Sequence, residues 1–316
     1  MRLLPECLES KRSMGLVCSL PLLPMTDFQN KKDGLLFGSF CADALSLGVH
    51  WIYDTGELSQ KFGYVSGYHA PGADSYHPKK EAGEQSHVGD QALRLAHFLR
   101  ENQAWNAEAF MASWVAMWPG YGDYFDHATK AALQNIENGK VLTEAASESN
   151  ELAGAARIAP LVAFYADQPE ADAVNACVEQ TLLTHASSMS GEATAFLATS
   201  AHRIANGALL EATIRKNAPA WALEKAEAVL PLEPVAAIGE LGQSCPLPAA
   251  LPAVIYLALK HGDDLPRAFS ENTMAGGDNC ARALALGMLL GAAHGLDAIS
   301  EAWRSGLVAK DLLVSR

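Results

Sequence analysis

Apolar residues recur at helical spacing along most of the chain, and the alternation typical of β-strands is nearly absent. In residues 91–100, for example, Leu95, Phe98 and Leu99 fall on one face of a helix. The pattern predicts helices over 91–100, 109–118, 173–183, 192–204, 251–260 and 279–294. Because these helices are of ordinary length and no strands separate them, we expect an all-α fold, an orthogonal multi-helix bundle.

The first 30 residues differ from this pattern. Lys11 and Arg12 precede an apolar stretch over 15–25, but Pro21 and Pro24 interrupt it and no small-residue cleavage pattern follows. We expect residues 1–30 to be a disordered N-terminal extension, with a processed targeting segment as the alternative. Residues 31–316 then form a single domain, which is large enough to bury a substantial core.

Two irregular segments interrupt the helices. Residues 64–86 contain several Gly, Pro, aromatic and His residues and form the longest break in the pattern. A loop of that length in a folded domain is more often functional or mobile than merely connective. Residues 118–127, WPGYGDYFDH, contain a turn at Gly120 and Gly122 and are expected to line a pocket from another side.

Charge and cysteine content narrow the class of protein. The chain has 23 Lys and Arg against 36 Asp and Glu, a net charge of -13, which disfavours a nucleic-acid duplex as partner. No apolar run is long enough for a membrane span. The six cysteines show no zinc-ligand or disulfide spacing, so we expect reduced thiols and a cytoplasmic protein. They are Cys7, Cys18, Cys41, Cys177, Cys245 and Cys280.

Aspartates stand at or near the start of several predicted helices. Asp90 follows Gly89, and Asp278 follows the glycine pair at 276 and 277, while Asp43 lies inside a helix of small residues that ends near Gly48. Each aspartate has a plain explanation as a cap for orphan backbone N–H groups. The glycine pair favours a functional role for Asp278, because backbone without Cβ atoms allows close approach of another group.

Two glycines mark the helix that follows Asp278. Gly287 and Gly291 are four residues apart and therefore lie on the same face of that helix. This spacing predicts close packing against a neighbouring helix, near the centre of the bundle.

Five segments, taken in order, resemble the ADP-ribosylglycohydrolase superfamily. GSFCADALSLGVHW, VGDQALRLA and GGDNCARALALGMLLGAAHG resemble the family patterns GALLGDALGAPVEF, TDDT at a helix start and GGDTDT. NELAGAARIAPL and LLTHASSMSGEATAFLA resemble two intermediate landmarks. The resemblance covers nearly the whole chain and implies the family's fold and hydrolysis of an ADP-ribosyl or related ribosyl glycosidic linkage.

The resemblance also implies a metal site with Mg²⁺ or Mn²⁺. Asp90 and Asp278 match family ligands and are the expected metal-binding and catalytic residues, together with His50 at the position of a family glutamate. Only two of four matched acidic positions remain, which predicts one ion rather than two. Further candidates for binding the substrate are Gln91, Asn150, Asn279 and Cys280.

Two functional hypotheses remain open at this point. The first is hydrolysis of an ADP-ribosyl ligand or an ADP-ribosylated protein. The second is a catalytically inactive ADP-ribose-binding or structural protein of the same fold, because the same substitutions resemble the subgroup of J-type crystallins and selenoprotein J. Cys280 at a helix start could also be a reactive thiol, although packing is its ordinary explanation.

Overall fold

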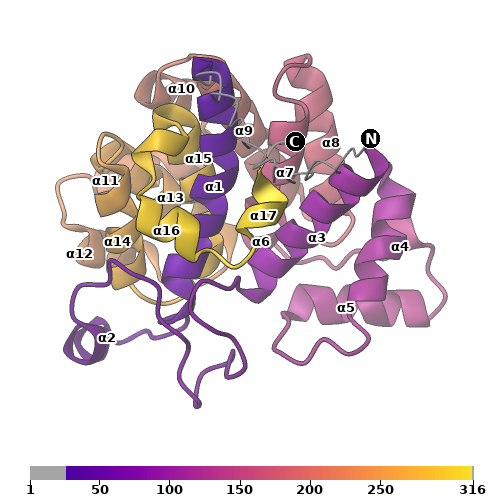
Figure 1. Cartoon of the computed structure of the whole chain (residues 1–316), viewed down its shortest axis with the longest axis horizontal. Coiled ribbons are helices and arrows are strands. Elements are labelled where there is room, and N and C mark those ends of the chain that lie inside the picture. Colours follow the sequence, from indigo (N-terminus) through magenta and orange to yellow (C-terminus); the bar gives the residue numbers. More distant parts are fainter. Residues whose placement is uncertain (1–25, 315–316) are drawn as a thin grey trace, which may run out of the picture.

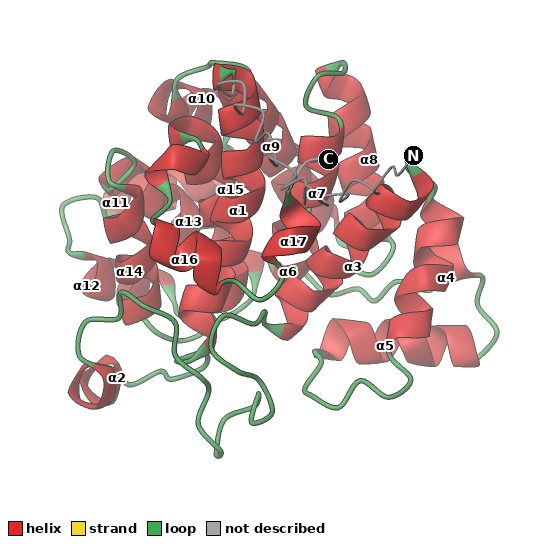
Figure 2. Cartoon of the chain, viewed as in Figure 1, coloured by secondary structure: helices red, strands yellow, loops and turns green. Residues whose placement is uncertain are grey.

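Helices joined by loops make up the computed structural model, which describes residues 26–314 (Figure 1, Figure 2). Within these residues there is no β-strand, only the isolated bridges Ser147–His185 and Glu151–Pro246. Between residues 26 and 314 no helix has the length and hydrophobicity that a membrane span needs. The α-helices are α1 (Asp27–Leu47), α2 (Thr55–Phe62), α3 (His87–Asn102), α4 (Ala107–Met117), α5 (His127–Glu137), α6 (Ala153–Ala156), α7 (Ala159–Phe164), α8 (Glu170–Leu182), α9 (Ser188–Ala205), α10 (Leu210–Asn217), α11 (Ala220–Ala228), α12 (Pro234–Leu241), α13 (Leu247–Lys260), α14 (Leu265–Met274), α15 (Asn279–His294), α16 (Glu301–Gly306) and α17 (Lys310–Leu313), with 3₁₀ turns at Leu142–Glu144 and Leu296–Ala298.

The expected all-α fold is confirmed. The observed helix boundaries differ in places from those that the sequence pattern predicted. The helix predicted over 279–294 matches α15, whereas α3 begins four residues before the predicted start. Ser86 caps α3 by accepting a hydrogen bond from Gly89 N, so the helix starts at His87. Near the N-terminus, α1 begins at Asp27, inside the segment 1–30 that was expected to be disordered. The remainder of that segment, residues 1–25, lies outside the described residues.

Helices α1 and α15 lie side by side in the middle of the molecule (Figure 1). Glycines form the contact between them: a Cβ built on Gly287 would lie 2.2 Å from Gly38 O, and one on Gly291 would lie 2.0 Å from Gly34 O. No side chain fits in so short a gap, so the two backbones approach each other directly. The close packing predicted from the spacing of Gly287 and Gly291 is therefore confirmed, and it sets the position of the start of α15 relative to the end of α1.

The irregular segment between α2 and α3 is held against the body of the molecule by hydrogen bonds. Tyr68 Oη donates a hydrogen bond to Trp303 O, and Trp303 Nε1 donates one to Ser66 O; the donor–acceptor distance is 3.0 Å in each. Near the end of the segment, Val308 N donates a hydrogen bond of 3.0 Å to Gly83 O. The segment is thereby fixed although it contains no helix, and it carries a histidine, His77, toward the end of α1.

Candidate functional site

The start of α15 lies against the loop that follows α1. Trp51 N donates to Gly277 O (2.9 Å) and Gly277 N donates to Ile52 O (2.8 Å), which joins the two loops. Gly276 and Gly277 have left-handed φ values of 66° and 67°, and Trp51 adopts a φ of 63° that is uncommon for a bulky residue. This backbone buries Asp278 at the start of α15, where its Oδ1 has no hydrogen-bond partner. Helix capping therefore leaves that oxygen unexplained.

Asp43 has a structural role at the contact between α1 and α3. Its Oδ2 accepts a hydrogen bond from Ser86 N (2.8 Å) and its Oδ1 accepts one from Ser86 Oγ (2.7 Å). Burial raises the pKa of Asp43 to about 7, although the bonds from Ser86 lower it. The carboxyl group holds the start of α3 against α1 and so fixes His87, the first residue of α3.

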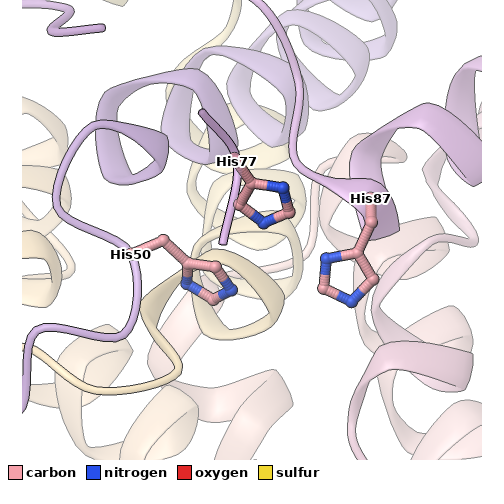
Figure 3. Close-up of side chains that lie close together, drawn as sticks. All are labelled: His50, His77 and His87. Carbon is pink, nitrogen blue, oxygen red and sulfur yellow. The ribbon is translucent and has the colours of Figure 1, made fainter. Parts of the chain in front are cut away.

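Three buried histidines from separate segments surround one small space. His50 follows α1, His77 lies in the irregular segment, and His87 opens α3. Figure 3 shows one nitrogen of each ring turned toward the space between the rings. One possible ligand nitrogen from each histidine lies within 4.8 Å of the other two, and no other group of three His, Cys, Asp or Glu within residues 26–314 meets that limit. We call these residues the histidine triad.

Each ring of the triad also faces an oxygen acceptor. His50 Nδ1 lies 3.0 Å from Asn279 Oδ1, and His77 Nδ1 lies 3.4 Å from Asp123 Oδ1. His87 Nε2 lies 3.5 Å from Asp126 Oδ2. The opposite nitrogens, His50 Nε2, His77 Nε2 and His87 Nδ1, are buried and have no hydrogen-bond partner, and His77 Nδ1 forms no hydrogen bond either. Such groups are costly unless something pairs with them.

Burial and neighbouring charges set the protonation of the triad. Burial lowers the pKa of His50 well below its ordinary value and, with the charge of His87, lowers that of His77 to about 4. Burial also lowers the pKa of His87, but the hydrogen bond and charge of Asp126 outweigh it, and the net pKa is raised. The same contact lowers the pKa of Asp126 although burial raises it. His87 is thus the ring that most readily holds a proton.

A pocket of about 430 Å³ opens beside the triad. This volume is in the range of small-molecule sites in proteins. Three aromatic side chains meet edge to face in its wall, with ring centroids 4.9 Å apart for Trp51 and Tyr76, 4.9 Å for Trp51 and Tyr124, and 5.4 Å for Tyr76 and Tyr124. The lining residues are Trp51, Tyr53, Tyr76, His87, Val88, Tyr124, Asp126, His127, Lys130, Glu151, Ala153, Cys245 and Asp278. The segment 118–127 lines the pocket, as its turn residues predict.

Asp90 and Gln91 are not among the lining residues. The carboxylate of Asp90 accepts hydrogen bonds from Lys80 Nζ and Tyr121 Oη, both at 2.6 Å to Oδ2. Gln91 Oε1 accepts from the buried guanidinium of Arg157 and from Trp114 Nε1. The structure therefore gives Asp90 and Gln91 partners within the protein and places only Asp278, of the two aspartates expected to bind metal, at the pocket.

The other expected residues divide between the triad and the core. Asn279 holds His50, as described, and His50 Nε2 lies 3.8 Å from Asp278 Oδ1. Cys280 is fully buried, and burial raises the pKa of its thiol well above the ordinary value, which favours the packing explanation over a reactive thiol. Asn150 pairs through its backbone with Leu247 N and precedes Glu151, the residue that lines the pocket.

Sequence reasoning did not single out His77, His87, Asp126 or Glu151. The sequence indicated only their segments: His77 lies in the irregular segment 64–86, and Asp126 lies in the segment 118–127 that was expected to line a pocket. His87 and Asp126 each stand at a helix start, His87 as the first residue of α3 and Asp126 as the cap of α5. Residues at such positions point out of the helix end rather than along its face, so helical periodicity does not reveal them.

The donor atoms at the site do not suit the hard cation that the sequence suggested. Mg²⁺ and Mn²⁺ take oxygen ligands, but Asp90 is paired with Lys80 and Asp126 faces His87. Among the pocket carboxylates within the described residues, no three approach one another within the 4.8 Å reached by the triad. The buried unpaired atoms that converge are three imidazole nitrogens, which are ligands of softer cations, with Asp278 Oδ1 3.8 Å from His50 Nε2.

Comparisons of the sequence and of the structure with known proteins indicate one family. The family model described as ADP-ribosylglycohydrolase matches residues 24–315. Crystallin J1A of Tripedalia cystophora is 25% identical over 301 residues, which cover 88% of this chain and 92% of the crystallin. A solved structure, "ADP-ribosylglycohydrolase-related protein complex", has a TM-score of 0.68 at 23% identity and covers 92% of this chain and 96% of that chain. At this identity the structural likeness shows the fold alone, and the resemblance seen in the sequence is confirmed.

Proposed function

The chain belongs to the ADP-ribosylglycohydrolase family, and on that premise we propose that the pocket beside α15 binds an ADP-ribosyl group and hydrolyses its glycosidic linkage. The observation that carries this proposal is the buried carboxyl group of Asp278, which lines the pocket with an unpaired oxygen. The substrate would be an ADP-ribosylated protein or a small ADP-ribosyl compound, with water as the acceptor.

The lining of the pocket supports a nucleotide-ribosyl ligand. The aromatic wall of Trp51, Tyr76 and Tyr124 offers ring faces and edges to a base, and the hydroxyl groups of a ribose would meet the carboxylate acceptors of the lining. Lys130, also in the lining, supplies a positive charge for a phosphate. These groups are few and converge on one volume, as expected for a ligand site.

Two carboxyl groups are suited to the chemistry. Hydrolysis of a glycosidic bond needs an acid for the leaving group and a base or stabilising charge opposite it. Burial, followed by the charges of Asp126 and Asp278, raises the pKa of Glu151, which suits a general acid. Burial also raises the pKa of Asp278. We assign Glu151 as the acid and Asp278 as the group that orients water and the ribose, with the imidazole of His50 beside Asp278 at 3.8 Å.

Release of ADP-ribose from Arg-, Ser- and O-acetyl-linked substrates tests the proposal. Wild type should release ADP-ribose, and Glu151→Gln and Asp278→Asn should each lower kcat by about 10²–10⁴-fold, the usual contribution of a general acid or base. The exposed Glu240 provides the control, since Glu240→Gln makes the same change away from the pocket. Equal rates in wild type and Asp278→Asn would contradict the assignment.

A second candidate is a binding or structural protein that lacks turnover. The similarity to Crystallin J1A favours it, as does the pairing of Asp90 within the protein. A thermal shift with ADP-ribose and no hydrolysis would support this candidate, because a ligand at 100 times its Kd stabilises the native state by about 2.7 kcal/mol. The same thermal shift with ADP-ribose, together with release of ADP-ribose from a linked substrate in the activity assay, would support the hydrolase.

A further inference from the structure

We propose that the histidine triad, His50, His77 and His87, is a binding site for a late first-row divalent cation, with Zn²⁺ as the reference ion. The inference does not depend on hydrolysis by the pocket, because it rests on the side chains of the triad and their partners alone. It places the metal at three imidazole nitrogens instead of at Asp90 and Asp278, where the sequence predicted Mg²⁺ or Mn²⁺.

The spacing of the three nitrogens suits one ion. Zn–N bonds of about 2.0–2.1 Å at tetrahedral angles place ligand nitrogens about 3.3 Å apart. The candidate nitrogens lie within 4.8 Å of one another. Closing on an ion therefore brings each pair together by at most about 1.5 Å. Rotations of the three side chains would bring the nitrogens to this distance.

The unpaired atoms are the second line of support. His50 Nε2, His77 Nε2 and His87 Nδ1 all belong to side chains that are at least nine-tenths buried, and none has a hydrogen-bond partner. Each unpaired buried group of this kind costs about 1–3 kcal/mol. Three of them around one space are explained together by a shared ligand, whereas packing alone explains none of them.

The oxygen partners on the outer side of the rings match the surroundings of metal-binding histidines. Such histidines donate their second N–H to a carboxylate or carbonyl oxygen, which fixes the ring and its tautomer. Asn279, Asp123 and Asp126 occupy these positions for His50, His77 and His87. Asn279 therefore fixes the ring of His50 before any ion binds, while Asp123 and Asp126 face the outer nitrogens of His77 and His87 at 3.4 Å and 3.5 Å.

The surroundings also define the class of ion and the open position. Three imidazoles favour Zn²⁺, Co²⁺, Ni²⁺ or Cu²⁺ over Mg²⁺ and Ca²⁺. The ring of Trp51 covers one side, with its centroid 4.0 Å from that of His50 and 5.6 Å from that of His77. Asp278 Oδ1, 3.8 Å from His50 Nε2 and unpaired, lies beside the remaining position. A fourth ligand, water or a pocket-bound oxygen, would enter from that side.

Titration of the chelator-treated full chain with Co²⁺ and Zn²⁺ tests the site. Wild type should bind one Co²⁺ per chain with a visible d–d spectrum, no thiolate-to-metal charge-transfer band, and displacement by Zn²⁺. Mg²⁺ should produce neither displacement nor a thermal shift. His77→Gln should abolish the Co²⁺ spectrum. The control is His261→Gln, since His261 is another buried histidine with an unpaired Nε2 outside the triad.

A second variant keeps the test decisive if His77→Gln does not fold. Asp123→Asn leaves all three rings in place and removes only the charge beside His77, so it should weaken Co²⁺ binding by about 10–100-fold. Unchanged Co²⁺ affinity in Asp123→Asn would overturn the proposal, and so would an unchanged Co²⁺ spectrum in a folded His77→Gln. So would a wild type that binds no Co²⁺, whatever its activity on ADP-ribosyl substrates.

Discussion

The direct contact between α1 and α15 predicts that one methyl group added to Gly287 destabilises the whole fold. The new Cβ would lie 2.2 Å from Gly38 O, and relieving this contact to an ordinary 3.4 Å separates the helices by about 1.2 Å. Overpacking of this kind costs about 1–3 kcal/mol, and rigid backbone on both sides places Gly287→Ala at the upper end. Alanine's better helix propensity returns only about 0.5–1 kcal/mol.

The matched control makes the same substitution where there is space. Gly239 lies in α12, and a Cβ there would meet nothing within 4 Å. Gly239→Ala should therefore stabilise the protein by about 0.4–1 kcal/mol through the unfolded chain, while Gly287→Ala destabilises it by about 2 kcal/mol. Urea unfolding of both variants measures the two effects. Midpoints that move in the same direction would refute the account of the α1–α15 contact.

Three further predictions concern single side chains. Ser86→Ala should lower the free energy of unfolding by about 2 kcal/mol, because it removes the cap of α3 and a hydrogen bond to buried Asp43, and Ser86→Thr should recover most of the loss in urea unfolding. Arg282→Met should cost about 3 kcal/mol, because the buried guanidinium donates to Gly276 O, and an unchanged urea midpoint would argue against this. Burial lowers the pKa of His185 to about 3, so the unfolded chain binds an extra proton below its own pKa of about 6.5. Stability should fall as the pH drops from 6.5 toward 3, and His185→Gln should reduce that slope by up to about 1.4 kcal/mol per pH unit.

The fold could be predicted because its causes are local. The glycine pair and Asp278 mark the start of α15, Gly287 and Gly291 inside it mark its packing face, and the structure agrees with each. The start of α3 could not be predicted in the same way, because Ser86 is held in its capping position by hydrogen bonds to Asp43, which is close in space but lies on α1, far away in the sequence. Asp90 therefore lies one turn inside α3 rather than at its first residue.

The site could be predicted only in part. The glycine pair singled out Asp278, which the structure places at the pocket, and His50 and Asn279 lie together beside it. Asp90 is turned to Lys80, a residue of the irregular segment whose path depends on hydrogen bonds near the C-terminus. His77 reaches the triad along the same path. Neither contact follows from periodicity, since it is set by tertiary contacts.

The pairing of α1 with α15 also has a consequence for synthesis on the ribosome. Ser39 and its partner Leu284 are 245 residues apart in the chain, so at about 5–20 residues per second the first helix waits roughly 12–50 s for its neighbour to emerge. During that interval the apolar surface of α1 has no permanent cover, and the start of α15 that supplies Asn279 does not yet exist. Folding and completion of the pocket should therefore coincide late in translation, when a nascent chain is most dependent on chaperones.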